Sequence, residues 1–331
     1  MDLKPHILVT GGCGYIGSHV TRQMSEAGYP VVVLDDLSSG HRGALLGNET
    51  FIEGSVGDGA LLDHLFTKYD FAGVLHFAAS IFVDESVANP LLYYRNNTAN
   101  TIVLLEAMVK RGVAKLIFSS TAAVYGETGD EPLTELSETR PQSPYGSSKL
   151  MNEWIIADAA AAHGLRHVTL RYFNVGGADL KGRIGQRNRR SNHLIKIALE
   201  AAVGKRERLA IYGEDYATLD GTCVRDYIHV EDLAAAHVNA LEYLLKGGTS
   251  QTLNCGYGRG YSVKEVVQVV EDVTGKPLQV VVAPRRPGDV ARLVADARQI
   301  RAVLGWQPQY DQLNVIVKSA WDWEKKLRSG L

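Results

Sequence analysis

Cysteine is scarce in this sequence, with only Cys13, Cys223 and Cys255 among 331 residues. They form neither a CxxC pair nor a cluster with histidine at zinc-ligand spacing, so the pattern excludes a disulfide-rich scaffold and predicts no metal site. Sparse cysteines of odd number are typical of a reducing compartment, and we expect a cytoplasmic protein. No apolar run is long enough to cross a membrane, and the first residues lead straight into a strand pattern, so we expect no signal peptide and no membrane partner.

An excess of either charge is also lacking. The 35 Lys and Arg residues nearly balance the 37 Asp and Glu residues, for a formal net charge of −2. A nucleic-acid-binding protein usually carries a strong basic excess, so we expect no nucleic-acid partner. One basic cluster nevertheless stands out, and it is open to two interpretations: a solvated loop or an attractor of anionic substrate. Its members are Lys181, Arg183, Arg187, Arg189 and Arg190.

Strand and helix patterns alternate over the first 170 residues or so. Short apolar runs predict strands at residues 6–10, 31–34, 50–53, 74–77, 116–118 and 168–171, and longer stretches predict helices, notably at 15–27, 90–110 and 145–163. Parallel strands need crossover connections, so the alternation predicts an α/β fold with a Rossmann-type, doubly wound parallel sheet. Beyond residue 174 the pattern weakens, although residues 194–203, 230–245 and 263–273 still read as helical. We therefore expect a first domain over residues 1–175 and a smaller, closely packed α/β domain over 176–331.

Three glycines stand between the first expected strand and the first expected helix. Gly11, Gly14 and Gly17 have GxxGxxG spacing, which allows a tight turn, a close approach of pyrophosphate to the backbone, and close helix–sheet packing. The helix N-terminus adds a partial positive charge for the phosphates. Asp35 ends the second expected strand, where a carboxylate accepts hydrogen bonds from ribose hydroxyls and repels a 2′-phosphate. The pattern predicts NAD as cofactor.

Tyr145 and Lys149 lie four residues apart at the start of an expected helix, which places both side chains on one face. A free tyrosine has a pKa of about 10, and a nearby ammonium group lowers it, so the pair is suited to remove a proton from an alcohol. A YxxxK spacing alone often arises by chance on the surface of an amphipathic helix. Here the expected strand upstream ends in Ser119, Ser120 and Thr121, whose hydroxyls can hydrogen-bond a substrate oxygen.

These segments resemble the extended short-chain dehydrogenase/reductase family, and within it the branch that epimerises UDP-glucose at C4. The likeness covers nearly the whole chain, and its most specific parts are the last two segments in the following list. The segments are TGGCGYIGSH (10–19), LDDLSSG (34–40), YYRNNTANT (93–101), SSTAAVYG (119–126), SPYGSSK (143–149), RYFNVGGA (171–178), DGTCVRDYIHVEDLA (220–234) and RRPGD (285–289).

The resemblance implies roles for individual residues. Tyr145 is implied as the acid/base, Lys149 as its partner and Thr121 as a hydroxyl donor. NAD is implied to contact Gly11, Gly14, Tyr15, Ile16, Gly17, Asp35, Leu37, Ser55, Val56, Phe77, Ala78, Ala79, Asn96, Ser119, Tyr145, Lys149 and Tyr172. The UDP-sugar substrate is implied to contact Thr121, Tyr145, Asn174, Asn192, His193, Tyr212, Arg225, Arg286 and Asp289, with the two arginines at the diphosphate.

Two positions depart from the family pattern. Ser55 stands where relatives often carry an aspartate near the adenine, and Ile81 stands where many carry a lysine at the cofactor.

A third feature concerns the reaction. In related dehydratases and decarboxylases acidic residues directly follow the threonine of the fifth strand, whereas Ala122 and Ala123 follow Thr121 here. We therefore expect C4 epimerisation of a UDP-hexose through a transient 4-keto sugar.

Three questions stay open at the level of the sequence. The substrate could be another UDP-sugar, such as UDP-N-acetylglucosamine, a UDP-pentose or UDP-glucuronate, and an NAD-sensing protein with a dead site is a further alternative. The resemblance also implies a homodimer joined through residues 90–110 and 145–163, although these helices could instead be internal. Finally, alignment from Asp289 places Leu293 beside the sugar's C2 substituent, unless Leu293 is a core residue of a strand.

Overall fold

A seven-stranded, all-parallel sheet forms the centre of the molecule in a computed structural model, which describes residues 4–126, 129–187, 191–286 and 288–329. The strand order is β10-β6-β5-β4-β1-β2-β3. The strands are β1 (His6–Thr10), β2 (Val31–Asp35), β3 (Thr50–Glu53), β4 (Phe71–His76), β5 (Lys115–Ser119), β6 (Arg166–Tyr172) and β10 (Gln251–Cys255). The chain reverses its direction of winding between β1 and β4, which opens a crevice at their carboxyl ends. The expected doubly wound Rossmann-type fold is confirmed.

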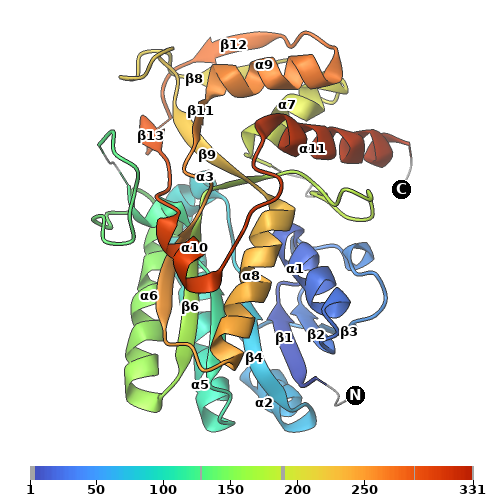
Figure 1. The fold of residues 1–331 in the computed structure, drawn as a ribbon, viewed down its shortest axis with the longest axis vertical. Coiled ribbons are helices and arrows are strands. Elements are labelled where there is room, and N and C mark those ends of the chain that lie inside the picture. Colours follow the sequence, from blue (N-terminus) through green and yellow to red (C-terminus); the bar gives the residue numbers. More distant parts are fainter. Residues whose placement is uncertain (1–3, 127–128, 188–190, 287, 330–331) are drawn as a thin grey trace.

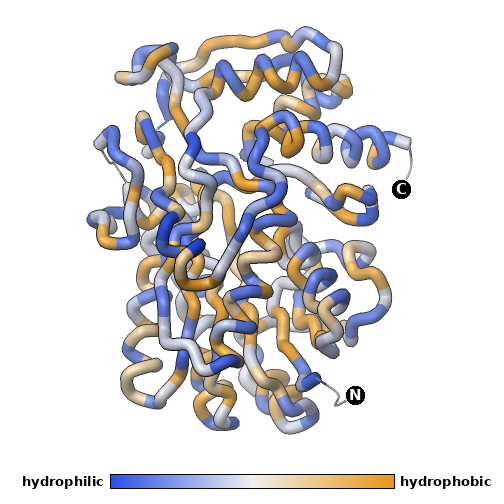
Figure 2. Tube along the Cα trace, viewed as in Figure 1, coloured by the Kyte–Doolittle hydropathy of each residue, from blue (hydrophilic) through white to orange (hydrophobic). Residues whose placement is uncertain are grey.

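Helices cover both faces of this sheet (Figure 1). On one face α1 (Tyr15–Glu26) and α8 (Val230–Leu245) pack against each other and the strands, and on the other lie α2 (Gly59–Lys68), α5 (Asn100–Lys110) and α6 (Pro144–His163). Each layer buries its own apolar cluster against the sheet, because strands covered on both faces present apolar side chains to both. Figure 2 shows the resulting hydrophobic strands at the centre of this part.

The stretch from residue 90 to residue 110 is not one continuous α-helix. A short α3 (Val83–Ala88) and α4 (Pro90–Tyr93) lead into a π-helical segment, Tyr94–Ala99, before α5 begins at Asn100. The helical stretch predicted for residues 90–110 is present, but six of its residues are π-helical, which the sequence pattern does not indicate. A π-helical turn widens the backbone and often occurs at functional sites.

The remaining elements lie beyond the carboxyl ends of the strands, in the upper part of Figure 1. They comprise two small sheets and three helices around a separate apolar cluster. One sheet contains β7 (Asn174–Gly176), β9 (Val224–His229), β11 (Gly260–Ser262) and β13 (Arg292–Leu293), and the other β8 (Leu209–Tyr212) and β12 (Val280–Ala283). The helices are α7 (Leu194–Ala202), α9 (Val263–Thr274) and α11 (Leu313–Arg328).

The chain passes between the two parts more than once. After β9 it returns to the large sheet as α8 and β10, and β10 pairs with β6. It then leads to the upper part again and comes back as the short α10 (Arg298–Leu304), which packs on β10 and α8. Residues 230–255 therefore complete the Rossmann sheet, although they lie in the second half of the sequence.

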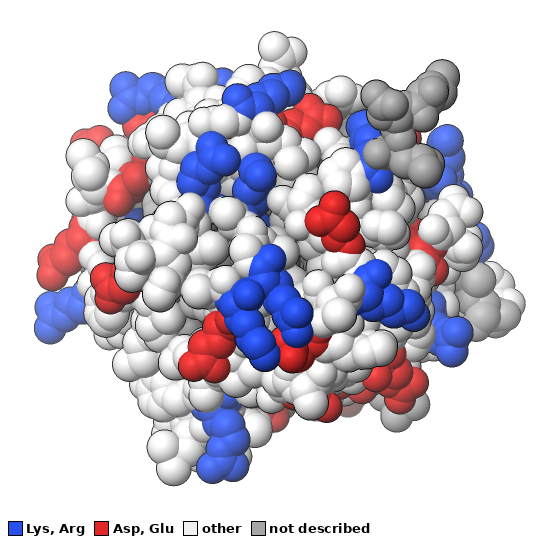
Figure 3. Space-filling model, turned by 90° about the horizontal axis from the view of Figure 1, so that it is seen from below, with Lys and Arg blue, Asp and Glu red and all other residues white. Residues whose placement is uncertain are grey.

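Charges of both signs mix on the surface. Figure 3 shows the face seen from below, where Lys and Arg alternate with Asp and Glu and no large patch of one sign forms. Within the described ranges, none of the helices combines the length and the apolar character that a bilayer crossing requires. The same residues contain no group of three or more His, Cys, Asp or Glu side chains placed to hold a metal ion.

Candidate active site

The glycine turn between β1 and α1 has no room for side chains. A Cβ on Gly11, whose φ is +71°, would lie 2.6 Å from the backbone nitrogen of Ala78, and one on Gly17 would lie 2.2 Å from the carbonyl oxygen of Gly11. Gly14 is the N-cap of α1 and has no side chain to occupy the first N–H groups of the helix. Those N–H groups have no partner inside a helix, so they face the crevice as donors for an anion.

Asp35 occupies the end of β2, next to this turn. Its carboxylate accepts hydrogen bonds from the backbone N–H of Cys13 (2.9 Å) and of Leu37 (2.8 Å). Burial raises the pKa of Asp35, and the two backbone hydrogen bonds oppose this effect. Leu37 has a φ of +56°, in the left-handed region, which turns the chain sharply after the carboxylate.

Other residues expected at the cofactor line the same crevice or support it. The Tyr15 hydroxyl donates to the Gly177 carbonyl (2.6 Å), so this side chain braces the turn and leaves only its main chain for a ligand. Ser55 accepts from the Gly57 N–H (3.1 Å) in the turn after β3. Phe77, Ala78 and Ala79 follow β4, and the partly buried Ile16 and buried Val56 pack in apolar clusters.

Asn96 lies in the π-helical segment and donates to the Ser80 hydroxyl (2.9 Å). The neighbouring Asn97 donates to the Ser148 hydroxyl (3.0 Å), and that hydroxyl donates to the carbonyl of Tyr145 (2.8 Å). The π-helical segment is thus tied to the first turn of α6. This chain of hydrogen bonds fixes the position of Tyr145 relative to the β4 crevice.

The hydroxyls of Tyr145 on α6 and of Thr121, just after β5, lie close enough for Thr121 to affect the pKa of the phenol. The helix begins just before Tyr145, because Ser143 caps it by accepting from the Gly146 N–H (3.2 Å) and Pro144 occupies its first turn. Burial raises the pKa of Tyr145, and the neighbouring Thr121 hydroxyl lowers it. The phenol therefore needs further positive charge nearby to lose its proton at neutral pH.

Lys149 lies one turn further along α6 and is almost completely buried, with 3% exposure. Its ammonium donates to the Ser119 carbonyl (2.7 Å) and lies 4.9 Å from the centre of the Phe118 ring. Burial lowers the pKa of Lys149 to about 7, and the carboxylate of Glu153 acts in the opposite direction. The Ser119 hydroxyl is in turn hydrogen-bonded to that of Tyr172.

A buried ion pair between Glu153, one turn beyond Lys149, and Arg171 was not predicted from the sequence. Glu153 on α6 receives three hydrogen bonds from Arg171 at the end of β6, the shortest of 2.6 Å, and a further one from the Ser120 hydroxyl. Both charged side chains are less than 10% exposed. Glu153 follows Tyr145 and Lys149 at i+8 and i+4 spacing, so helical periodicity was the available signal.

The residues expected at the UDP moiety gather around β9 and its neighbours. Asp289 lies 2.9 Å from Arg286 and 3.8 Å from Arg225, so one carboxylate joins the two guanidinium groups. The Arg286 guanidinium also lies 4.5 Å from the centre of the Tyr212 ring. Asn174 in β7 and Asn192 are solvent-exposed, while burial lowers the pKa of His193 to about 4.

Leu293 is opposite Arg225 in the pairing of β13 with β9. It is partly buried and packs against an apolar cluster that includes Ala122 and Phe173, the neighbours in sequence of Thr121 and Tyr172. This position links the diphosphate side of the site to the Thr121–Tyr145 pair. Leu293 is thus a strand residue, and its strand borders the site.

The structure describes only part of the basic cluster at residues 181–190. Arg183 forms ion pairs with Asp179 (2.8 Å) and Glu26 (3.0 Å), so its charge is used within the fold. Arg189 and Arg190 lie outside the described residues. We therefore interpret Arg183 as a structural residue, and not as one that attracts an anionic substrate.

Three comparisons with known proteins agree on the family. Residues 8–318 match a family model described as GDP-mannose 4,6 dehydratase. The UDP-glucose 4-epimerase of Azospirillum brasilense is 54% identical over 328 residues, which cover 99% of this chain and 94% of that protein. The chain belongs to the extended short-chain dehydrogenase/reductase family, in its UDP-glucose 4-epimerase branch.

Solved structures of UDP-glucose 4-epimerases share the whole fold. The enzyme from Brucella ovis in complex with NAD has a TM-score of 0.93 at 44% identity, covering 96% of this chain and 98% of that one. The UDP-Glc/GlcNAc 4-epimerase from Campylobacter jejuni has a TM-score of 0.85 at 48% identity, covering 97% and 99%. The resemblance read from the sequence motifs is confirmed, whereas the roles of single residues remain predictions that the geometry supports.

Proposed function

We propose that this member of the UDP-glucose 4-epimerase family interconverts UDP-glucose and UDP-galactose with NAD as a resident cofactor. The observation that carries the proposal is that Thr121 lies beside Tyr145, with the buried Lys149 one turn away on the same helix and bonded to the Ser119 carbonyl. The pair lies at the carboxyl edge of the sheet, where the glycine turn also opens. Arg225 of the Arg225–Asp289–Arg286 group lies on β9, one of the elements beyond that edge (Figure 1).

The residues of the glycine turn fit a dinucleotide. Gly11 and Gly17 allow close main-chain packing in the turn, and the N-cap Gly14 places no side chain before the first N–H groups of α1, so a pyrophosphate can approach them directly. Asp35 is held by two backbone N–H groups, and its carboxylate keeps further acceptor capacity for ribose hydroxyls. A 2′-phosphate beside it would meet a like charge, which favours NAD over NADP.

The chain's own residues provide the proton chemistry. Tyr145 takes the proton of the C4 hydroxyl as that carbon is oxidised and returns it when the carbon is reduced, while the Thr121 hydroxyl holds the same oxygen. Lys149 places a positive charge near the phenol and favours its ionised form. A bound NAD would supply the hydride acceptor and donor that inversion at C4 requires. The cofactor is thus regenerated in each turnover, and no external redox partner is needed.

The two arginines of the upper part suit the diphosphate. Guanidinium groups present forked donors that match pairs of phosphate oxygens. In the structure Arg225 and Arg286 share Asp289, and a diphosphate offers them a higher density of negative charge. The carboxylate of Asp289 then becomes available to ribose hydroxyls, as the family resemblance implies.

Epimerisation fits the site better than dehydration. Loss of water from a 4-keto sugar requires a further acid and base near the sugar. Ala122 and Ala123 directly follow Thr121, and an alanine transfers no proton. Dehydration, which the name of the matching family model describes, is therefore not the reaction that we propose.

We propose that the sugar specificity depends on the side chain of Leu293, whose strand pairs with β9. A leucine there leaves more room than a tyrosine would, but it offers no hydrogen-bond partner to an acetamide, and an unpaired buried amide costs about 1–3 kcal/mol. We therefore propose strong activity on UDP-glucose and UDP-galactose and weak activity on UDP-N-acetylglucosamine. Pentose and uronate sugars remain the alternative substrates.

A homodimer through α5 and α6 is part of the proposal. A groove of about 330 Å³ runs between these helices and is lined largely by apolar side chains, among them Ile102, Val109 and Ile155. Ile102 is 39% exposed, and Ala159 on α6 allows a second helix to approach closely. Two copies of this groove face each other in an isologous dimer.

We also propose which ligand each part of the chain binds and where in the cell the protein is located. We assign NAD binding to residues 1–175 and UDP-sugar binding to residues 176–331, with α8 and β10 of the second part inserted in the first. A cytoplasmic location rests on the three cysteines, which are all unpaired and buried.

The direct test is an epimerisation assay. The purified protein should convert UDP-galactose to UDP-glucose without added NAD, and it should release NAD when it is denatured. A protein that yields no dinucleotide on denaturation, or that leaves C4 of both UDP-hexoses unchanged, would contradict the proposal.

A further inference from the structure

The C-terminal helix α11 holds the loop that precedes the expected nucleotide contacts. Three of its side chains form hydrogen bonds with the main chain of this loop. The Ser319 hydroxyl accepts from the Ala178 N–H (3.2 Å). The Lys326 ammonium donates to the Gly182 carbonyl (2.6 Å), and the Trp323 indole donates to the Gln186 carbonyl (3.0 Å). The indole also packs against Gly185, where a Cβ would come within 2.6 Å of the ring. The path of the loop is therefore set by α11.

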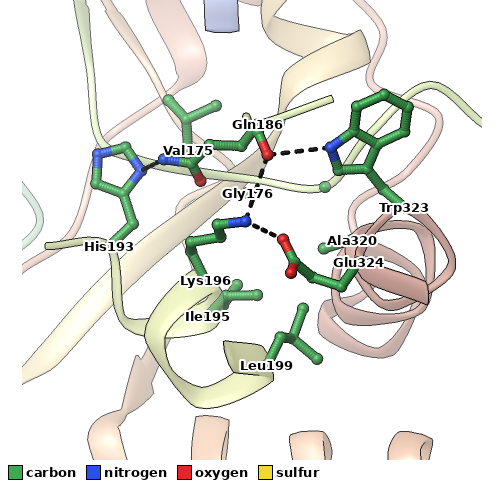
Figure 4. A pocket seen from close by; sticks show the side chains of 11 residues that line it. Val175, Gly176, Gln186, His193, Ile195, Lys196, Leu199, Ala320, Trp323 and Glu324 are labelled. Atoms are coloured by element: carbon green, nitrogen blue, oxygen red, sulfur yellow. Dashed lines mark hydrogen bonds and ion pairs between the residues drawn. The ribbon is translucent and has the colours of Figure 1, made fainter. Parts of the chain in front are cut away.

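A buried ion pair joins α11 to α7 at the same place (Figure 4). Lys196 and Glu324 are 6% and 1% exposed, and their side chains form an ion pair. The Lys196 ammonium also lies 3.4 Å from the Gln186 carbonyl, so this oxygen receives hydrogen bonds from both Lys196 and Trp323. The cavity beside them has a volume of about 10 Å³, which admits a single water and no larger ligand.

The side chain of Gln186 extends this contact to His193. Its amide nitrogen lies 3.2 Å from the Ser191 hydroxyl and 3.4 Å from Nδ1 of His193, and the His193 N–H donates to the same hydroxyl (3.2 Å). His193 is neutral, since burial lowers its pKa to about 4, and an amide that donates to Nδ1 leaves the proton on Nε2. In Figure 4 the second ring nitrogen points away from Gln186.

We propose that Glu324 is a positioning residue for nucleotide binding, although it lies on a helix that the expected substrate contacts do not include. Its carboxylate holds Lys196, Lys196 and Trp323 fix the main chain at Gln186, and Gln186 sets the place and the tautomer of His193. This inference rests on the proposed function, in which Asn192 and His193 contact the UDP moiety. It implies that the charge of Glu324 contributes to UDP affinity and not to the proton transfer at Tyr145.

The test uses Glu324→Gln in the purified protein with its own cofactor. We expect the Kd for UDP, measured by calorimetry, and the KM for UDP-galactose to rise about tenfold, which is 1.4 kcal/mol. The kcat, its pH profile and the amount of NAD released on denaturation should stay at the wild-type level. Asp322→Asn is the matched control, because Asp322 lies on the same helix but pairs with Lys318 and Lys325 at the surface, and it should change neither constant.

A second variant covers the case in which Glu324→Gln does not fold. Gln186→Met keeps the backbone carbonyl but removes the amide that reaches His193, and it should weaken UDP binding without loss of the ion pair. In a double-mutant cycle the effects of Glu324→Gln and Gln186→Met should be less than additive, since both act through His193. Unchanged UDP affinity in Gln186→Met, or in a folded Glu324→Gln protein of lower Tm, would overturn the inference. If the wild-type protein binds no UDP, the proposed function itself fails. This outcome differs from failure of the inference alone, in which the wild-type protein binds UDP and the variants bind it equally well.

Discussion

Replacing Glu153 by glutamine should disturb both the stability and the proton chemistry of the protein. The substitution keeps the shape of the side chain but removes the charge that pairs with Arg171, and both residues are less than 10% exposed. Removing one partner of a buried ion pair costs about 3–5 kcal/mol. An unfolding entropy of about 2.1 cal/mol/K per residue then corresponds to a fall in Tm of about 4–7 °C for a chain of this length.

The effect on the chemistry follows from Lys149. Burial lowers the pKa of this lysine to about 7, and Glu153 is the group that raises it. Without that carboxylate the pKa of Lys149 falls further, so a smaller fraction of the amine is protonated at neutral pH and the ionised form of Tyr145 is supported less well. We expect the acidic limb of the kcat profile, which reports loss of a proton from Tyr145 in the substrate complex, to move to higher pH. The displacement should be smaller than in Lys149→Ala, which removes the cation entirely.

The assay is the pH dependence of kcat with saturating UDP-galactose, together with thermal unfolding of the same preparations. Glu135→Gln serves as the control, because Glu135 lies at the edge of the same network, where its backbone carbonyl accepts from Arg171, and its side chain bonds the backbone at Asn254. It should leave the kcat profile in place. A Glu153→Gln protein that loses stability but keeps the wild-type kcat profile would refute the reasoning, because Glu153 would then act on the fold alone.

Three other substitutions test separate parts of the proposal. Tyr145→Phe should lower kcat by about 10²- to 10⁴-fold while the protein still releases NAD on denaturation, and near wild-type turnover would argue against its role as acid/base. Leu293→Tyr should reduce the ratio of kcat/KM for UDP-N-acetylglucosamine to that for UDP-glucose by about five- to tenfold, equal to about 1 kcal/mol, and an unchanged ratio would move the specificity gate elsewhere. If the proposed dimer forms, Ile102→Glu should convert it to a monomer in light scattering, because it places a charge in the groove between α5 and α6, and a dimer of unchanged stability would place the interface on another surface.

The Rossmann sheet could be predicted from the sequence because its strands are buried on both faces. Runs such as His6–Thr10 and Val31–Asp35 are apolar at nearly every position, and glycines or polar residues mark their ends. The strand β10 could not be found in this way, because its sequence QTLNC mixes polar and apolar residues. It also joins the sheet only after the 78 residues that separate it from β6, and a local pattern does not encode such a pairing. The helix α11 was missed although its apolar residues Leu313, Ile316, Val317 and Trp321 follow helical spacing.

The candidate site shows a similar division. Motifs that follow a strand or begin a helix, such as the glycine turn and the Tyr145–Lys149 pair, are local and could be read directly. The π-helical segment at Tyr94–Ala99 depends on tertiary hydrogen bonds, such as that between Asn97 and Ser148, and its sequence has no distinguishing period. Ion pairs between distant elements, such as Glu153 with Arg171 and Lys196 with Glu324, require the fold before either partner can be named.

The two buried carboxylates suggest how the molecule separates binding from chemistry. Glu153 supports a lysine that donates to the carbonyl of Ser119, next to the reacting hydroxyls, whereas Glu324 pairs with a lysine that reaches the carbonyl of Gln186, next to the expected nucleotide contacts. Glu153 acts on the charge of Lys149 one helical turn away, whereas Glu324 forms an ion pair with Lys196, and each lysine donates to a main-chain oxygen near functional side chains. The first arrangement affects the proton affinity of Tyr145, and the second affects only the position of His193. If this division is correct, Glu153→Gln changes the pH profile of kcat with little change in UDP affinity, whereas Glu324→Gln lowers UDP affinity and leaves the pH profile in place. The two effects should add in the double variant, because the two sites share no partner.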